Sequence, residues 1–196
     1  MKHIVHTLIS LALVNAPLVA LAADGGSTYN NNCINCHGGG AVGMATPVIE
    51  GQNPRYVVGQ IALFKSGARQ DQTMHAMNSV AASLDDQTVQ NVATFLASKS
   101  YCDLPGSIVN PGIGDVNAGK SVVSAHSCTS CHLPNSPLNA PILVGQKTNY
   151  IVNQLNDFRN GSRKSQFMNS IANQLSDRDI NDVAAFFNSQ RNCPNQ

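Results

Sequence analysis

Two short stretches of the chain combine residue types that can do chemistry. Residues 33–37 read Cys-Ile-Asn-Cys-His, and residues 128–132 read Cys-Thr-Ser-Cys-His. Haem c is attached at this pattern, because two thiols at this spacing can each add to a vinyl group of the ring, and the next histidine can bind the iron. The two copies predict two covalent haem groups. The attachment and ligand residues would be Cys33, Cys36 and His37 for the first, and Cys128, Cys131 and His132 for the second.

A zinc site is the alternative use of the same cysteines. Four thiolates can hold zinc when two Cys-x-x-Cys pairs converge. That site would leave both following histidines without a role, and it needs reduced thiols, which an oxidising compartment does not favour. Haem attachment is therefore the preferred interpretation.

The rest of the chain is a tandem repeat built around these stretches. Residues 46–69 align with residues 140–163, and residues 77–102 align with residues 168–193. Self-similarity at a fixed offset indicates duplication of one structural unit. The segment 103–115 is rich in proline and glycine and is typical of a linker.

Methionines at one position of the repeat are candidates for the second axial ligand of each iron. Met77 and Met168 occupy the same place in the two copies. A thioether ligand favours ferrous iron and raises its potential. A methionine can also fill a gap in a core, but both copies keep one here. Met74 has no partner in the second copy, and His75 is an alternative ligand for the first iron.

The apolar spacing predicts helices that would hold these residues. A helix should lead into each Cys-x-x-Cys-His, and residues 54–67 and their counterpart show a helical period. Asp85 should cap the last helix of the first copy, and Ser176 with Asp179 resembles a capping box in the second. No region alternates with a period of two, so we expect an all-α protein.

The N-terminus predicts export. A basic start precedes an apolar stretch, and Ala20-Leu21-Ala22 fits a cleavage site. An uncleaved anchor is the alternative, although Asn15 and Pro17 disfavour a spanning helix. We expect the mature protein in the periplasm. The predicted division is a signal peptide at 1–22, a first domain at 23–102, a linker at 103–115 and a second domain at 116–196.

The composition agrees with a bound cofactor and excludes one class of partner. Aromatic residues make up only 5% of the chain and tryptophan is absent, so a bulky group would supply missing apolar mass. Charged residues are 12%, about half of the ~25% that is typical. No basic run is present, and we therefore expect no binding of nucleic acid.

Taken together, these motifs resemble the cytochrome c4 family of dihaem cytochromes. The resemblance rests on Cys-x-x-Cys-His, then Pro-x3-Gly-Gln-x3-Tyr-x3-Gln, then Phe-x2-Gly-x-Arg, and then Met before the last helix, each present twice. It implies two class I cytochrome c domains related by a pseudo-twofold axis, with their haems facing each other.

The resemblance also assigns roles around each iron. The carbonyls of Pro47 and Pro141 would accept the Nδ1 proton of the two histidines. Four further residues would lie near the haem propionates or the domain interface, although the tyrosines could instead be packed core rings: Tyr56, Tyr150, Arg69 and Arg163.

The predicted function is electron transfer without catalysis, because histidine and methionine together leave no open position on either iron. The resemblance suggests a small copper protein or a quinol-oxidising complex as donor and a terminal oxidase as acceptor, with membrane association only through such complexes. The main alternative is the haem subunit of a flavocytochrome-type sulfide dehydrogenase, and a dihaem peroxidase is a third option.

Two cysteines remain after haem attachment. Cys102 and Cys193 end the last helix of each copy, and an exported protein rarely keeps two free thiols, so a disulfide is expected. Such a bond needs the two Cα atoms within about 7 Å. Buried free thiols and an intermolecular link are the alternatives.

Overall fold

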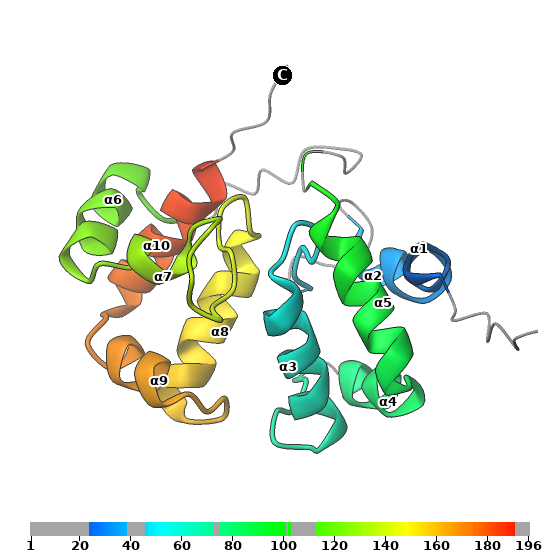
Figure 1. Cartoon of the computed structure of the whole chain (residues 1–196). Coiled ribbons are helices and arrows are strands. Elements are labelled where there is room, and N and C mark those ends of the chain that lie inside the picture. The colour runs from blue at the N-terminus through cyan, green and yellow to red at the C-terminus, as the bar shows by residue number, and fades with distance from the viewer. Residues whose placement is uncertain (1–23, 39–45, 73–74, 101, 103–112, 191–196) are drawn as a thin grey trace, which may run out of the picture.

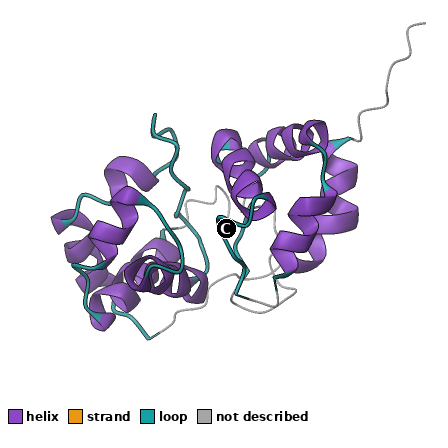
Figure 2. Ribbon diagram, turned by 90° about the horizontal axis from the view of Figure 1, so that it is seen from below, coloured by secondary structure: helices purple, strands orange, loops and turns teal. Residues whose placement is uncertain are grey.

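All regular secondary structure in the described part of the chain is helical (Figure 2), which confirms the all-α prediction. The computed structural model describes residues 24–38, 46–72, 75–100, 102 and 113–190. The predicted signal peptide, most of the predicted linker, Met74 and Cys193 lie outside these residues. Within them, no helix has the length and apolar character needed to cross a membrane.

The helices form two groups, one from each copy of the repeat (Figure 1). The first group contains α1 (Gly25–Thr28), the π-helical η1 (Tyr29–Cys33), α2 (Ile34–His37), α3 (Pro54–Lys65), α4 (Ala76–Ser83) and α5 (Asp86–Ala97). The second group contains α6 (Val116–Ala125), α7 (Thr129–His132), α8 (Thr148–Asn160), α9 (Gln166–Ala172) and α10 (Asp177–Ser189). We call them the first half and the second half.

The last helix organises each half. In the first half α5 packs on α1 and α3, and in the second half α10 packs on α6 and α8. Glycine makes both crossings possible, since a Cβ on Gly25 would lie 2.2 Å from the Asn91 carbonyl oxygen, and a Cβ on Gly119 would lie 2.0 Å from that of Asp182. These close crossings fix the helix that leads into each Cys-x-x-Cys-His.

The predicted helix starts are present. The Asp85 side chain accepts a hydrogen bond from the Thr88 amide at 2.7 Å, and Ser176 and Asp179 form a capping box at α10. The apolar face of α5 is buried and consists of Val89, Val92, Ala93 and Leu96. The short helices α4 and α9, which carry the two repeat methionines, were not anticipated from the sequence.

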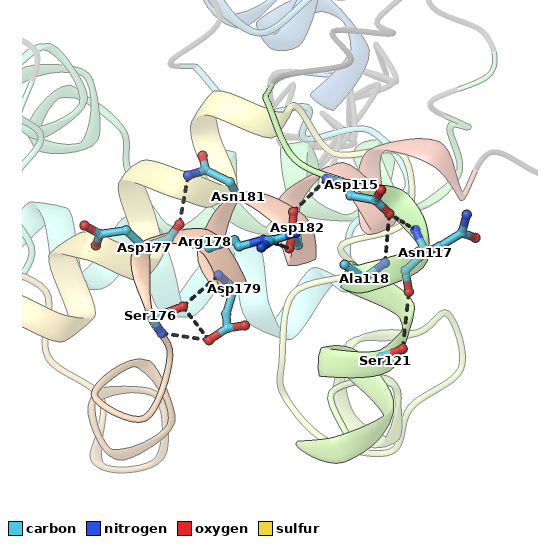
Figure 3. A network of polar contacts seen from close by, with 10 residues as sticks. All are labelled: Asp115, Asn117, Ala118, Ser121, Ser176, Asp177, Arg178, Asp179, Asn181 and Asp182. Atoms are coloured by element: carbon cyan, nitrogen blue, oxygen red, sulfur yellow. Dashed lines mark hydrogen bonds and ion pairs between the residues drawn. The ribbon is translucent and has the colours of Figure 1, made fainter.

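A polar network ties α6 to α10 in the second half (Figure 3). The Asp115 amide donates to the carboxylate of Asp182, a residue only 4% exposed, at 2.7 Å. The Asp115 side chain in turn accepts from the amides of Asn117 and Ala118 at the start of α6. The network therefore anchors the start of α6, which leads to the second Cys-x-x-Cys-His.

The two halves meet through reciprocal contacts. Gln146 of the second half accepts from the Val48 amide and donates to the Val48 carbonyl, both at 2.9 Å. Gln52 of the first half makes the matching pair with Ile142, at 3.0 and 2.7 Å. Equivalent residues exchange equivalent bonds, which is the mark of an approximate twofold arrangement.

Candidate haem-attachment sites

Each half holds one buried histidine at the end of a short helix. His37 ends α2 and His132 ends α7, and their exposed fractions are 6% and 8%. The Nδ1 atom of His37 lies 2.9 Å from the carbonyl oxygen of Pro47, and the Nδ1 atom of His132 lies 2.8 Å from that of Pro141. The proline residues named from the sequence therefore contact the histidines.

These contacts put both imidazoles in the form that binds iron. A carbonyl can only accept, so each Nδ1 carries the proton and Nε2 keeps its lone pair. Burial lowers the pKa of His37 and of His132, which keeps both rings neutral. No hydrogen bond to either Nε2 occurs among the described residues. A buried nitrogen lone pair without a partner fits an iron ligand.

The two cysteine pairs fit covalent attachment better than a zinc site. Cys33, Cys36, Cys128 and Cys131 are free thiols. Burial first, and then Cys36 and Glu50, raise the pKa of Cys33 to about 11. The described residues, which include both motifs, contain no cluster of three or more metal-binding side chains. The zinc alternative therefore has no structural support.

The backbone approaches the two motifs differently. In the first half α1, η1 and α2 follow one another directly, with π-helical turns before the motif. In the second half α6 ends at Ala125, and Ser127 adopts a left-handed φ of 52° before α7 begins. In both motifs the cysteines are three residues apart on helical backbone, so their thiols lie on one face.

Met77 and Met168 have equivalent positions, half-buried near the start of α4 and of α9. The Met77 amide donates to Asp71 at 3.2 Å, and the Met168 amide donates to Ser165 at 3.3 Å. The alternative ligand His75 is exposed, with a left-handed φ of 56°. Ligation by the methionines stays a prediction.

Sequence reasoning missed an asparagine next to each methionine. Asn78 donates to the carbonyls of Phe64 and Arg69, both at 2.9 Å, and accepts from the Asp71 amide at 2.8 Å. Asn169 makes the corresponding bonds to Phe158, Arg163 and Ser165. These side chains hold the loop that delivers each methionine. The repeated Met-Asn dipeptide was the available signal.

The four remaining candidate residues meet at the interface between α3 and α8. Arg69 donates to Tyr150 at 3.1 Å and to Gln154 at 2.8 Å. Arg163 donates to Tyr56 and to Gln60, both at 2.9 Å. Each arginine also donates to the glutamine of its own half, at 2.6 Å. Both tyrosine hydroxyls therefore contact the arginine of the other half, and a role near the haem propionates stays a prediction.

This interface concentrates positive charge. Neither Arg69, which is 8% exposed, nor Arg163 forms an ion pair with a carboxylate among the described residues. Burial alone would raise the pKa of Tyr150, but the two arginines outweigh it and hold this pKa below its ordinary value. Two cations with only neutral partners fit a site that receives anionic groups.

Cys102 is half-buried and disulfide-bonded, so the alternative of a free thiol is wrong for this residue. It does not end the last helix of the first half as predicted, because α5 ends at Ala97. Cys193 lies outside the described residues, so the pairing of these two cysteines stays a prediction.

Comparisons with known proteins agree with this geometry. The family model described as "Cytochrome C oxidase, cbb3-type, subunit III" matches residues 20–96 and 114–187, one segment in each half. A cytochrome c4 of Pseudomonas aeruginosa is 30% identical, over 94% of this chain and 96% of that protein. A "Thiosulfate dehydrogenase electron acceptor" of Stutzerimonas stutzeri is 31% identical, over 95% of each. Among solved structures, cytochrome c4 of Acidithiobacillus ferrooxidans is similar with a TM-score of 0.67 and 28% identity, covering 80% of this chain and 97% of that one.

Proposed function

Because the chain belongs to the cytochrome c4 family of dihaem c-type electron-transfer proteins, we propose that it carries electrons in the periplasm between a respiratory donor and a terminal acceptor. The observation that carries the proposal is the duplicated histidine site. Each copy offers a neutral, buried imidazole with Nε2 free, next to a pair of unbonded thiols.

Each half contributes a matched set of residues. Cys33 and Cys36 would attach the first group, and His37 would hold its iron with Met77 as the second ligand. The corresponding residues of the second half are Cys128, Cys131, His132 and Met168. Bound haem c supplies a one-electron iron couple. The proline carbonyls keep each imidazole oriented, which limits rearrangement when the charge on iron changes.

The two interface arginines would serve both groups. Arg69 and Arg163 lie on the rings of Phe64 and Phe158, at 4.4 and 4.6 Å from the ring centroids, and bridge to the opposite half. We assign both arginines to the haem propionates, whose negative charges would form ion pairs with the two guanidinium groups. Both haems would then be held through the same interface.

A carrier role without catalysis follows from full coordination of iron. Histidine and methionine ligands leave no position for oxygen or peroxide, so the chain alone should turn over neither. A dihaem peroxidase would need one iron to lose a ligand. Half-reduced protein that consumes peroxide would therefore contradict the carrier role.

The experiment that tests the proposal combines mass with potentiometry. The purified protein should carry two haems, no flavin, and two one-electron transitions. Met77→Ala should abolish the methionine–iron charge-transfer absorption of one haem and lower its potential by on the order of 0.2 V, within the ~0.8 V range that axial ligands span. Met168→Ala should do the same to the other haem. If Met77→Ala left both haems unchanged, its ligand role would be wrong, and His75 would be tested next.

A second candidate role is that of electron acceptor for a specific dehydrogenase. The relative named thiosulfate dehydrogenase electron acceptor favours a thiosulfate-oxidising donor, and the flavocytochrome-type sulfide dehydrogenase is the corresponding flavin-dependent alternative. Mixing the oxidised protein with each class of donor distinguishes them. Reduction by a small copper protein or a quinol-oxidising complex supports the respiratory role. Co-purification with a flavoprotein supports the sulfide dehydrogenase subunit.

A further inference from the structure

The first haem site has a buried acid in the loop that follows its proline, and the second site has none at the corresponding position. Glu50 follows the loop that carries Pro47 and is 4% exposed. The hydroxyl of Tyr29, on the helical run that leads to His37, donates to one of its oxygens. The Ile49 amide donates to the other at 3.1 Å. In the repeat, Glu50 and Tyr29 correspond to Val144 and Ser124.

The geometry indicates that Glu50 carries a negative charge. Both of its oxygens accept hydrogen bonds, which an ionised carboxylate can do without turning a proton toward a donor. Burial and Glu50 raise the pKa of Tyr29, so the phenol stays protonated and donates. Glu50 also lines a cavity of about 140 Å³ that has room for water beside the carboxylate.

A buried cation from the other half approaches the same region. Lys147 precedes α8 and is only 6% exposed. Its backbone amide donates to Gln146 Oε1, which also accepts from the Val48 amide, two residues before Glu50. Burial lowers the pKa of Lys147, and Glu50 raises it. Lys147 corresponds to Asn53 in the first half, so this charge also breaks the symmetry.

The charged groups near the two proline–histidine contacts therefore differ. Glu50 lies three residues after Pro47, whose carbonyl oxygen contacts His37. The side-chain oxygen of Gln146 accepts from both the Val48 amide and the Lys147 amide. In the second half the residue three positions after Pro141 is the uncharged Val144.

We infer that the buried carboxylate of Glu50 lowers the reduction potential of the first haem, and that Lys147 opposes it across the interface. Ferric iron carries one more positive charge than ferrous iron, so a nearby negative charge stabilises the oxidised form and a positive charge destabilises it. The inference rests on the proposed haem sites. It makes the first haem the weaker electron acceptor of the pair.

The test is a potentiometric titration of three variants of the holoprotein. Glu50→Gln should raise one of the two potentials, with about a tenfold change in the ferrous-to-ferric ratio at fixed ambient potential, or about 59 mV for one electron. Lys147→Gln should move the same transition in the opposite direction. The matched control is Asp86→Asn, which removes a negative charge that is 98% exposed in the same half and should move neither transition.

Several outcomes would overturn the inference. The inference fails if neither variant shifts a reduction potential, or if both transitions shift equally. It also fails if Glu50→Gln and Lys147→Gln shift different transitions. If Glu50→Gln does not fold, Lys147→Gln alone tests the inference. A rise in both reduction potentials, or no change in both, then contradicts the assignment. Haem content by mass keeps this separate from the proposed function: a protein without two haems refutes the function, whereas two haems with unshifted potentials refute only the role of Glu50.

Discussion

The two halves share one fold but differ in the size of the connected cluster that their buried apolar residues form. In the first half, the buried cluster found among the described residues consists of Tyr29, Val92 and Leu96. The first half also buries Val48, Phe64, Ala81, Val89 and Ala93 outside its cluster. The second half has a larger one: Val123, Ile151, Leu155, Phe158, Ala172, Leu175, Ile180, Val183, Ala184 and Phe187. Repeat positions that are buried in α8 are partly exposed in α3, as with Ile151 against Val57 and Leu155 against Ile61.

This difference indicates how far each half depends on its cofactor. A small cluster supplies little of the hydrophobic free energy that must offset the entropy of ordering the chain. The first half should therefore rely more on the apolar faces of its haem, while the second half has a core of its own. Duplication preserved the fold, and the packing then diverged.

Preventing haem attachment in one half at a time should give the largest difference in stability between the two halves. Cys33→Ala with Cys36→Ala should unfold α1–α5, because losing a ring that buries several hundred Å² of apolar surface costs on the order of 10 kcal/mol, as much as a typical domain has. Cys128→Ala with Cys131→Ala should leave more of α6–α10 helical. Hydrogen exchange measured by segment reports both halves. Greater loss in the second half would refute the interpretation.

Substitutions of the glycines at the helix crossings should give the next largest difference in stability between the halves. Gly119→Ala should destabilise the second half by about 3 kcal/mol, because its Cβ would meet the backbone of α10 and overpacking of this kind strains both helices. Gly25→Ala should cost less, since α1 is a single turn and can shift. Gly59→Ala is the control, because nothing lies within 4 Å of its Cβ, and it should stabilise α3 by about 1 kcal/mol. Thermal unfolding of the three holoproteins measures the order, and equal losses for Gly25→Ala and Gly119→Ala would contradict it.

The sequence predicted the parts of this protein that depend on local pattern. The Cys-x-x-Cys-His motifs, the cap at Asp85 and the capping box of Ser176 and Asp179 are each set by residues within a few positions of one another. The register of the repeat also brought Arg69 and Arg163 to attention, because both copies kept them.

What the sequence did not predict depends on contacts between distant segments. In the sequence nothing distinguishes Glu50 from the other acidic residues, and only the fold shows that it is buried against Tyr29. The loop-holding roles of Asn78 and Asn169 were missed for a related reason, because their partners are backbone carbonyls that carry no sequence signature. The asymmetry of the two sites follows from such contacts.

Substitutions of the two interface glutamines should differ in their cost to stability by a smaller amount. Gln146→Ala removes two bonds to Val48 and one from the Lys147 amide, leaving buried groups unpaired at a cost of about 2–3 kcal/mol. Gln52→Ala removes only the two bonds to Ile142 and should cost about 1–2 kcal/mol. Gln90→Ala, on the exposed face of α5, is the control. Denaturant midpoints of the holoproteins test this order, and a larger effect at Gln52 would reverse it.

Acid should destabilise the second half more than the first, although the effect is the smallest of the four. Hydrogen bonds from Thr88 lower the pKa of Asp85 in the first half. In the second half, amide bonds from Ala118 and Asn117 lower the pKa of Asp115, and Ser176 lowers that of Asp179. A carboxyl with a depressed folded-state pKa stabilises the protein above its unfolded pKa of about 4, and this stabilisation is lost as the pH falls through the folded pKa.

The second half has two such carboxyls at helix starts against one in the first half, so it should lose more stability between neutral pH and about pH 3, despite its larger core. Asp115→Asn should flatten this dependence, because asparagine caps a helix without titrating. Asp85→Asn is the matched variant, which should flatten only the first half. Segment-resolved hydrogen exchange at several pH values measures both slopes. A steeper acid loss in the first half would mean that packing against the haem, rather than the caps, controls stability at low pH.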